Sequence, residues 1–377
     1  MRIGINILFL IPGKIGGTEI YTRALIAALA RNDVSNEYFV YRNRETEANI
    51  VPKVATFHDR PQPIRATSRP LRITYEQLVL PFELARDRID VVLNCGITAP
   101  IMATCPMITV FYDVQYTRFG HYLGKFELLI TRLLFSASAR RSTRLVSMTQ
   151  AAETELIATY PSVRGKTFVI PHGIESEFCD IAEQRARLAN TRTQRAFPFV
   201  LAVSSLMAHK NFETLLHAFV HVHATRPSLR LIIVGLRGTR ADILEKLCDV
   251  LDLREVVHFT GWIPRGDVYN LFRDADAFVF SSRYEGFGIP VLEAMTAGIP
   301  IACSDIPALR EIAGEAASYF DPDSAESIAI ALELLLDDDL VRERSTSLGI
   351  RRARDFDWDR NIEPLIVSLS TIAKPHV

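Results

Sequence analysis

The sequence predicts an α/β protein with two doubly wound domains, and three observations predict it. At 377 residues, the chain is too long for one compact core and suits two domains of roughly 150–200 residues each. Short apolar runs alternate with longer amphipathic stretches from end to end, which is typical of parallel βαβ units. Residues from about 175 to 196 are polar and rich in Arg and Gln, so we place the domain boundary there.

The expected elements follow this alternation in chain order. In the N-terminal half we expect a helix over residues 18–31 and strands at 3–11, 91–93, 107–111, 145–147 and 167–170. In the C-terminal half we expect strands at 198–203, 229–235, 256–259, 276–280 and 300–303, with helices at 211–225, 240–252, 266–274, 290–297 and 324–336.

The predicted domains are Rossmann-like and cover residues 1–180 and 181–357. A last amphipathic helix lies within residues 358–377 and is expected to cross back to the first domain. Ligands of doubly wound sheets bind beside the carboxyl ends of the strands. A deep cleft between two facing domains is therefore the expected site.

Composition and charge exclude several classes of protein. The chain carries 43 Lys and Arg residues against 44 Asp and Glu residues, whereas binding to a nucleic-acid backbone needs a clear basic excess. Its five cysteines are scattered without a Cys-x-x-Cys pair, which argues against a disulfide framework and fits a reducing, cytoplasmic environment. No stretch approaches the roughly 20 apolar residues of a membrane span. We interpret the apolar start as a buried first strand and not as a signal peptide.

The strongest motif is Glu285-Gly-Phe-Gly-Ile-Pro-Val-Leu-Glu293, directly after an expected strand. Gly286 and Gly288 allow the backbone to approach a ligand closely, and Pro290 suits the first turn of a helix. Free amide groups and the positive end of that helix would face an anion. The two carboxylates can then reach different parts of one molecule, such as the hydroxyls of a sugar and of a ribose. The alternative is a strand, turn and helix with two incidental glutamates.

Residues 282–300 resemble the signature of the family 4 glycosyltransferases, which are retaining enzymes of the GT-B fold. That family carries two glutamates with seven residues between them, followed by Ala-Met-x-x-Gly-x-Pro, and Ala294-Met-Thr-Ala-Gly-Ile-Pro300 matches here. The likeness extends to residues 259–263, 275–277, 304–305, 311 and 321–322. The resemblance implies that Glu285 contacts the donor sugar and Glu293 the ribose of the nucleotide.

A second element, residues 203–211, also follows an expected strand. A lysine at a strand end, before an asparagine that can cap the next helix, is well placed to meet a diphosphate. In the enzymes that this sequence resembles, a lysine at the position of Lys210 contacts the donor pyrophosphate, often with an arginine five or six residues earlier. Ser204 and Ser205 stand there instead. Either Lys210 acts with backbone donors alone, or Arg237 or another cation substitutes.

Two elements of the N-terminal half complete the candidate site. The turn with Gly16 and Gly17 lacks the Gly-x-Gly-x-x-Gly pattern of dinucleotide folds and is either an anion cradle or a simple loop. In family 4 enzymes this turn closes over the donor phosphates. Tyr112 and Asp113 stand where many family members have His-Asp. Because a phenol is a poor general base at pH 7, we expect Tyr112 to contact the sugar or acceptor, while Asp113 remains the catalytic candidate.

Two further patterns leave alternatives open. His217 and His221 are four residues apart on an expected helix, but its apolar stripe leaves them toward solvent, so we expect no metal and no cofactor. Residues 118–144 hold six cations and one glutamate, with leucines between them. This segment is either a basic amphipathic surface that touches anionic lipid, where a lipid-linked acceptor would sit, or a core-packed helix with a basic solvent face.

The resemblance implies retaining glycosyl transfer from a nucleoside diphosphate sugar to a glycan or lipid-linked acceptor. The diphosphate departs, and the acceptor hydroxyl attacks from the same face. Residues 203–211 resemble mannosyltransferases of bacterial surface polysaccharide synthesis, which points to mannose from GDP-mannose. The alternatives are a GT-B nucleotide-sugar epimerase and a catalytically inactive GT-B subunit that binds a partner transferase.

These interpretations define a set of site residues in a cytoplasmic protein with peripheral contact to the inner face of the membrane. The expected catalytic residues are Glu285, Lys210 and Asp113. The expected donor-binding residues are Gly16, Gly17, Ser204, Ser205, Lys210, Gly286, Phe287, Gly288, Ile289 and Glu293.

Overall fold

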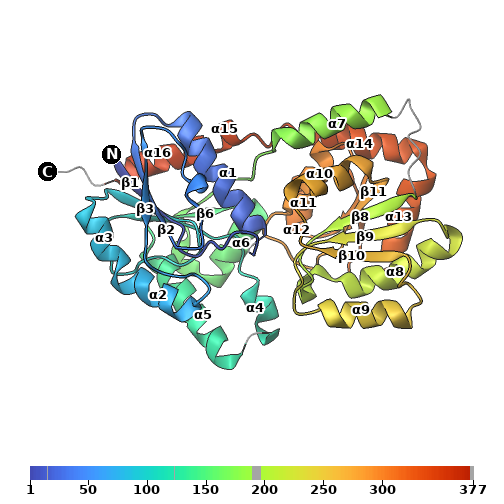
Figure 1. The fold of residues 1–377 in the computed structure, drawn as a ribbon, viewed down its shortest axis with the longest axis horizontal. Helices are drawn as coiled ribbons and strands as arrows, with labels where there is room; N and C mark the ends of the chain where they lie inside the picture. The colour runs from blue at the N-terminus through green and yellow to red at the C-terminus, as the bar shows by residue number, and fades with distance from the viewer. Residues whose placement is uncertain (15, 123, 189–196, 374–377) are drawn as a thin grey trace. The chain divides into compact units, whose positions relative to one another are not determined.

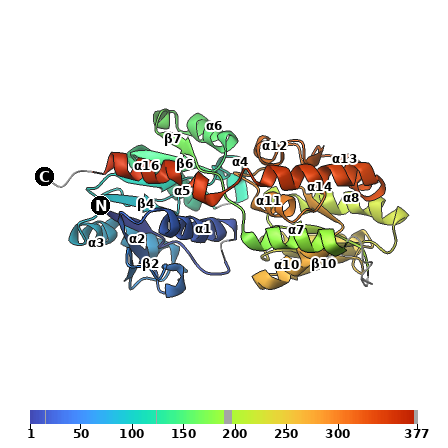
Figure 2. The same ribbon diagram turned by 90° about the horizontal axis from the view of Figure 1, so that it is seen from above.

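The chain folds into two compact units, which are coloured along the sequence in Figure 1. The computed structural model describes residues 1–377 except residues 15, 123, 189–196 and 374–377. The first unit comprises Met1–Gly173 and Asp357–Val377, and the second comprises Ile174–Phe356. Each unit has one parallel sheet with helices on both faces, as Figures 1 and 2 show.

A seven-stranded sheet forms the first unit, in the order β3-β2-β1-β4-β5-β6-β7. Its strands are β1 (Arg2–Asn6), β2 (Glu37–Arg42), β3 (Phe57–Pro61), β4 (Val91–Asn94), β5 (Met107–Val110), β6 (Arg144–Ser147) and β7 (Thr167–Val169). Its helices before residue 173 are α1 (Gly17–Asn32), α2 (Arg69–Leu78), α3 (Leu80–Arg86), α4 (Tyr116–Phe119), α5 (Lys125–Arg141) and α6 (Gln150–Thr159), with 3-10 turns η1 (Ala48–Ile50), η2 (Gly120–Tyr122) and η3 (Pro161–Val163). All residues of β4 and β5 are buried, as expected for a parallel sheet covered on both faces.

The expected first strand over residues 3–11 is too long. β1 ends at Asn6, and the N–H of Leu10 donates to the carbonyl of Ile7 at 3.1 Å, which closes a turn. Ile7, Leu8 and Leu10 are nevertheless fully buried. The apolar run is therefore a short strand followed by a buried turn, and hydrophobicity alone does not distinguish the two.

The second unit has a six-stranded sheet in the order β10-β9-β8-β11-β12-β13. Its strands are β8 (Phe199–Val203), β9 (Arg230–Val234), β10 (Val257–Gly261), β11 (Ala277–Phe280), β12 (Ile301–Ser304) and β13 (Ala317–Phe320). Its helices are α7 (Ser176–Leu188), α8 (Phe212–Thr225), α9 (Ala241–Val250), α10 (Arg265–Asp274), α11 (Ile289–Thr296), α12 (Pro307–Ala313), α13 (Ala325–Asp337) and α14 (Asp339–Ala353), and the turn η4 (Ala208–Lys210) precedes α8. The ten elements expected between residues 198 and 336 are confirmed, whereas α12, β13 and α14 were not expected.

The polar stretch in which the domain boundary was expected is mostly a helix of the second unit, which begins at Ile174. Phe178 and Ile181, three residues apart on α7, are buried, and Phe178 packs edge-on against Phe272 with ring centroids 5.0 Å apart. Arg185 reaches across and donates to the carbonyl of Ala275 at 2.8 Å. The long polar side chains of α7 thus hide a narrow apolar stripe. The expected boundary at residue 180 falls inside this helix.

The C-terminal residues form two short helices of the first unit, α15 (Trp358–Asn361) and α16 (Glu363–Ile372). Trp358 is buried and packs edge-on against Tyr21 and His172, with ring centroids 5.2 and 5.1 Å away. The side chain of Asn361 donates to the carbonyl of Pro171 at 3.2 Å. Among the helices of the described residues, none has both the length and the apolar character that a bilayer crossing requires.

We expect Trp358→Ala to destabilise the first unit by about 3–5 kcal/mol, because truncation of a buried aromatic side chain leaves a cavity. Urea unfolding followed by far-UV circular dichroism measures this loss. The matched control is Asp359→Ala, which removes a half-exposed ion pair with Arg31 and an exposed hydrogen bond from Asn32 and should cost less than about 1 kcal/mol. Equal stability of the two variants would contradict the role of Trp358.

Candidate functional site

The carboxyl ends of β8 and β11 form the candidate site of the second unit. The strand order of the sheet reverses between these neighbours, and doubly wound sheets bind ligands in the crevice at such a point. The chain leaves β8 into residues 204–211 and leaves β11 into residues 281–288, so both loops emerge at one edge of the sheet. These loops hold the expected site residues of this unit, except Ile289 and Glu293, which lie on α11.

Lys210 and Glu285 form an ion pair between the two loops. The Nζ atom of Lys210 lies 2.6 Å from Oε1 of Glu285, and the side chains are only 15% and 12% exposed. The hydroxyl of Ser281 donates to the carbonyl of Lys210 at 2.9 Å, and the N–H of Arg283 donates to the carbonyl of His209 at 2.8 Å. These bonds fix the ammonium and the carboxylate where the two strands end.

The imidazole of His209 adds no positive charge to this pair at neutral pH. Burial and the Lys210 ammonium lower the pKa of His209 to about 4. Among the described residues, Lys210 is the only cation within ion-pair distance of Glu285. The positive charge at this point of the site therefore comes from one lysine.

Arg237 pairs with two carboxylates of α9 and not with Glu285. Its guanidinium lies 2.5 Å from Asp242 and 2.5 Å from Glu245 on the exposed side of α9. Ser204 and Ser205, which stand where relatives often carry arginine, lie in the loop after β8 and are partly buried. The sequence left two alternatives for the positive charge that would meet a diphosphate: Lys210 with backbone N–H groups, or Lys210 with a second cation. The described residues favour Lys210 with backbone N–H groups.

Asn211 occupies the N-cap position of α8, but its side chain does not cap the helix as expected. Its backbone adopts a left-handed conformation with φ of 58°. Its Nδ2 group donates to the carbonyl of Pro322 at 2.6 Å, and its Oδ1 atom accepts from the hydroxyl of Thr214 at 2.7 Å. The side chain thus ties the start of α8 to the loop after β13 instead of to the helix backbone.

Gly288 sets the geometry of the turn from Glu285 into α11. Its φ is 107°, and an added Cβ would lie 2.5 Å from Cδ2 of Leu309, so both the backbone and the available space require glycine. Phe287 is buried and packs edge-on against Phe356, with ring centroids 5.9 Å apart. The hydroxyl of Ser282 is buried without a hydrogen-bond partner among the described residues. The turn is therefore held rigidly beside the Lys210–Glu285 pair.

The Glu293 carboxylate is 6% exposed and lies in a charged cluster. The Nη2 atom of Arg265, on α10, donates to Oε1 of Glu293 at 2.5 Å and to both carboxylate oxygens of Glu175 at 3.0 Å. The hydroxyl of Tyr269 donates to Glu175 at 2.9 Å. Burial raises the pKa of Glu293, whereas the Arg265 guanidinium opposes the increase. Arg265 supplies the counter-charge that a buried carboxylate needs.

Sequence reasoning missed Arg265, Glu175 and Tyr269. No spacing motif joins them, because they lie on α10 and at the start of α7, and only the fold brings them to Glu293. One signal could have found Arg265: it closely follows β10, at the same edge of the sheet as the loops after β8 and β11.

Tyr112 lies in the interior of the first unit. Its hydroxyl donates to the carbonyl of Cys95 at 2.8 Å and lies 3.1 Å from the hydroxyl of Thr22. Its ring packs edge-on against Tyr21 with centroids 5.5 Å apart, and burial raises its pKa well above 10. The structure shows a packing role, which leaves the expected sugar or acceptor contact of Tyr112 without support.

Gly16, Gly17 and Asp113 also belong to the first unit. Gly16 precedes α1 with φ of 63°, and an added Cβ would meet no atom. The nearby N–H of Gly13 donates to the carboxylate of Glu19 at 2.8 Å, so part of this turn already serves an anionic group. Asp113 accepts from the N–H of Gln115 at 3.0 Å and shapes the loop after β5. Their contact with a donor stays a prediction.

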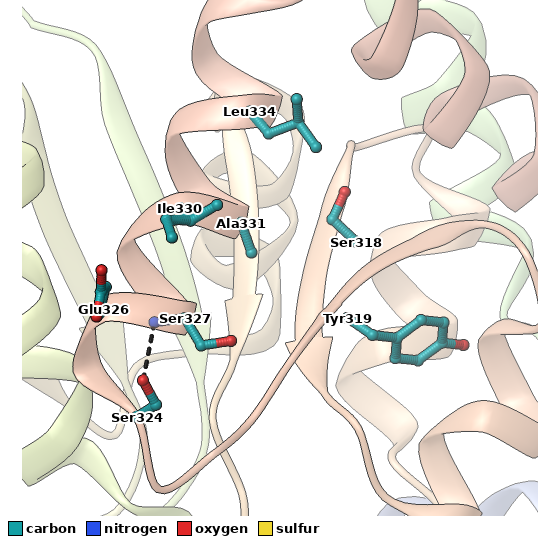
Figure 3. A pocket seen from close by; sticks show the side chains of 8 residues that line it. All are labelled: Ser318, Tyr319, Ser324, Glu326, Ser327, Ile330, Ala331 and Leu334. Atoms are coloured by element: carbon teal, nitrogen blue, oxygen red, sulfur yellow. Dashed lines mark hydrogen bonds between the residues drawn. The ribbon is translucent and has the colours of Figure 1, made fainter.

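One pocket lies away from these positions. It lies between β13 and α13 with a volume of ≈ 390 Å³, and Figure 3 shows the side chains that line it. It is lined by Ser318, Tyr319, Ser324, Glu326, Ser327, Ile330, Ala331 and Leu334. None of these residues belongs to the expected site, and the Ser324 hydroxyl caps α13 by accepting from the N–H of Ser327 at 3.1 Å.

No group of three His, Cys, Asp or Glu side chains is placed to hold a metal ion among the described residues. His217 and His221 are exposed on α8. That the protein needs no metal and no cofactor stays a prediction.

Two sequence families match the chain. Residues 15–178 match the family described as Glycosyltransferase Family 4, and residues 184–352 match Glycosyl transferases group 1. The O-antigen chain mannosyltransferase B of Escherichia coli is 26% identical over 254 residues, which are 67% of this chain and 67% of that protein.

Solved structures share the fold. WaaG, a glycosyltransferase involved in lipopolysaccharide biosynthesis, has a TM-score of 0.75 and 18% identity over 100% of both chains. HepE of Anabaena, in complex with UDP-glucose, has a TM-score of 0.72 and 18% identity over 98% of this chain and 99% of its own. Two parallel-sheet α/β units with these neighbours define the GT-B fold.

The protein is thus a glycosyltransferase of GT-B type. The two family models together match most of the chain, which is a retaining hexosyltransferase.

We expect Glu293→Gln to raise the free energy of unfolding at pH 7. The pKa of Glu293 is raised in the folded state, so its stabilising contribution is present at acidic pH and is lost as pH rises through that pKa. Glutamine mimics the protonated form, and the gain should vanish near pH 4. Urea unfolding at both pH values measures it. Glu343→Gln, at an exposed carboxylate of α14, is the control, and a destabilised Glu293→Gln would contradict the expectation.

Proposed function

We propose that the protein transfers mannose from GDP-mannose to a glycan or lipid-linked acceptor in the synthesis of a cell-surface polysaccharide. The donor class is supported by the matches to both glycosyltransferase families and by HepE, which shares the fold and binds UDP-glucose. Mannose is supported by the relative described as an O-antigen chain mannosyltransferase. Ser204 and Ser205 in place of arginine agree with this choice.

The observation that carries the proposal is the Lys210–Glu285 ion pair at the reversal of strand order. An ammonium has three N–H donors, and Glu285 engages one of them through Oε1 at 2.6 Å. The others can bind the diphosphate of a donor. The second carboxylate oxygen of Glu285 can accept from the hydroxyls of the transferred sugar.

Glu293 is assigned to the ribose of the nucleotide. Among the described residues it accepts only through Oε1, from Arg265, which leaves Oε2 for the two ribose hydroxyls. Arg265 positions the carboxylate, and Glu175 and Tyr269 position Arg265. The amide groups of Gly286, Phe287, Gly288 and Ile289, at the start of α11, face the donor in this arrangement.

In the proposed reaction, the bond between the sugar C1 atom and the β-phosphate oxygen breaks, and a bond from C1 to the acceptor oxygen forms on the same face. The acceptor proton passes to the departing phosphate oxygen. Lys210 stabilises the negative charge that develops on the leaving diphosphate. Asp113, with Gly16 and Gly17 of the first unit, is proposed to complete the site, and no metal ion or cofactor takes part.

We expect Lys210→Ala to lower kcat about 100- to 1000-fold, because removal of one donor that stabilises a developing charge typically costs ~2.7–4 kcal/mol. Glu285→Ala should lose at least as much. The rate of GDP release from GDP-mannose, with and without added acceptor, measures the loss. Arg237→Ala is the matched control, since its cation pairs only on the exposed side of α9 and should leave the rate unchanged. A Lys210→Ala variant with most of its activity would refute the assignment.

Donor choice is tested by thermal shift with GDP-, UDP- and ADP-sugars. We expect GDP-mannose to raise Tm most, because a ligand that binds only the folded state stabilises it in proportion to its affinity. A larger shift in Tm with a UDP- or ADP-sugar would show that GDP-mannose is not the preferred donor, while the proposed class of reaction would stand. No shift with any nucleotide is the behaviour of an inactive subunit. Isomerised nucleotide-sugar formed without acceptor is the behaviour of an epimerase.

A further inference from the structure

Helix α2 of the first unit buries charged side chains and exposes apolar ones. Arg72 and Glu76 are its buried residues, at 9% and 2% exposure, whereas Leu71 and Leu78 are 61% and 54% exposed. A helix of a folded domain usually turns an apolar side toward the core. Arg72 and Glu76 are four residues apart and therefore lie on the same side of the helix. This buried side of α2 needs polar or charged partners.

Glu76 contacts the point at which the first sheet reverses its strand order. β1 and β4 are neighbours, with β2 and β3 on one side of them and β5, β6 and β7 on the other. Asn6 and Asn94 are the last residues of these two strands and stand opposite each other in the register. Nδ2 of Asn6 donates to Oε1 of Glu76 at 2.7 Å. Doubly wound sheets bind ligands beside the carboxyl ends of the strands at such a point.

Hydrogen bonds engage the uncharged side chains and the carboxylate at this point. Nδ2 of Asn6 also donates to Oδ1 of Asn94 at 3.1 Å, and Nδ2 of Asn94 donates to the hydroxyl of Thr109 at 3.2 Å. The hydroxyl of Thr98, in the loop after β4, donates to Oε2 of Glu76 at 2.7 Å. Both carboxylate oxygens of Glu76 therefore already accept from neutral groups.

The guanidinium of Arg72 is engaged by no such bond. Its Nη1 atom is buried without a hydrogen-bond partner, and no carboxylate among the described residues lies within ion-pair distance of it. Burial and the nearby Arg69 cation lower the pKa of Arg72, and the Glu76 carboxylate offsets this decrease only in part. A cation with so little solvent around it is costly unless an anion binds it directly.

The loop after β4 is strained beside Glu76. Ile97 has a φ of 66°, a left-handed conformation that is exceptional for a β-branched residue. Gln77 of α2 holds this loop: its side chain donates to the carbonyl of Ala99 at 2.9 Å and accepts from the N–H of Ile101 at 3.0 Å. Backbone strain that the surrounding structure maintains is concentrated at ligand sites.

We infer that Arg72 binds an anionic group, a phosphate or a carboxylate, of the acceptor. The N–H donors of a guanidinium form a planar fork that matches the oxygens of either group, and the bound anion provides the counter-charge that Arg72 lacks. The inference rests on the proposed function and deepens it, because the acceptor is then a negatively charged glycan or glycan phosphate and not a neutral sugar.

The donor is a less suitable ligand for Arg72. The proposed contacts of the donor diphosphate and ribose are Lys210 and Glu293 of the second unit. Gly16 and Gly17, which are proposed to complete that site, precede α1, whereas Arg72 lies on α2, whose Gln77 contacts the loop after β4. The anion that meets Arg72 is therefore assigned to the acceptor.

A purely structural role, as the counter-charge of Glu76, explains Arg72 less well. Direct ion pairs serve that role elsewhere in this unit, as between Arg60 and Asp87 at 2.9 Å. Glu76 instead spends its oxygens on Asn6 and Thr98. A structural role also predicts that no added anion binds at Arg72, which an experiment can decide.

Isothermal titration calorimetry of the full chain tests the inference with two anions and their neutral counterparts. The probes are glycerol phosphate against glycerol, and glucuronate against glucose. We expect at least one anion to bind and its neutral counterpart not to bind, and the anion that binds more tightly identifies phosphate or carboxylate as the recognised group. Arg72→Gln should bind that anion about 10- to 100-fold more weakly, because it loses charge-assisted hydrogen bonds.

Three further variants isolate the role of Arg72. Arg72→Lys keeps the charge without the planar fork and should bind with an affinity between those of wild type and Arg72→Gln. Glu76→Gln removes the neighbouring negative charge and should bind the anion at least about twofold more tightly. Arg86→Gln, at an exposed arginine of α3 that pairs with Glu83, is the matched control and should bind like wild type. Far-UV circular dichroism and Tm verify that each variant folds.

Several results would overturn the inference. One is a wild type that binds neither anion or that binds the neutral counterparts equally well. Another is anion binding that Lys210→Ala weakens and Arg72→Gln does not, because the probe would then occupy the donor site. A third is a loss of GDP affinity in Arg72→Gln as large as its loss of anion affinity, because Arg72 would then contact the donor. A rise in Tm with GDP-mannose, together with no binding of either anion, would refute this inference alone and leave the proposed function in place.

Discussion

The mutual neutralisation of Lys210 and Glu285 is the interaction on which the candidate site depends. Either charge alone would be costly in so little solvent, whereas the pair at 2.6 Å is tolerated. The pair joins two loops that are 75 residues apart in sequence, and these loops meet only because β8 and β11 are neighbours in a parallel sheet. The sheet order thus brings the two loops together, and the ion pair links them.

The second unit could be predicted well from the sequence because its inner strands β8, β9, β11 and β12 are buried on both faces and are therefore continuous apolar runs. Lys210 and Glu285 could be predicted to meet for the same reason, since each follows such a run. Arg265 could not. Its contact with Glu293 depends on how α10 packs beside α11, and no local pattern describes the packing of two helices that are distant in sequence.

The expectations that differ from the structure have one physical origin: the local sequence does not determine which distant residues a side chain contacts. The polar stretch near residue 180 forms a helix because Phe178 and Ile181 find an apolar partner surface. Tyr112 was expected to contact the sugar or acceptor because it stands where many family members have histidine; its hydroxyl is bound inside the unit, and the expected contact stays a prediction. The leucines of α5 divide between core and solvent, which only the helical phase and the packing decide.

Two residues of this protein depart, in opposite senses, from the rule that charged side chains are exposed and large apolar side chains are buried. Glu293 is a charge in a buried place, where burial raises its pKa and only Arg265 offsets the cost. Phe126 is a large apolar ring in an exposed place. Each arrangement costs stability that an ordinary core or surface residue would not cost, and natural sequences concentrate such exceptions at functional sites. Both residues lie on helices of units that have extensive apolar cores, and those cores supply the stability that the two arrangements cost.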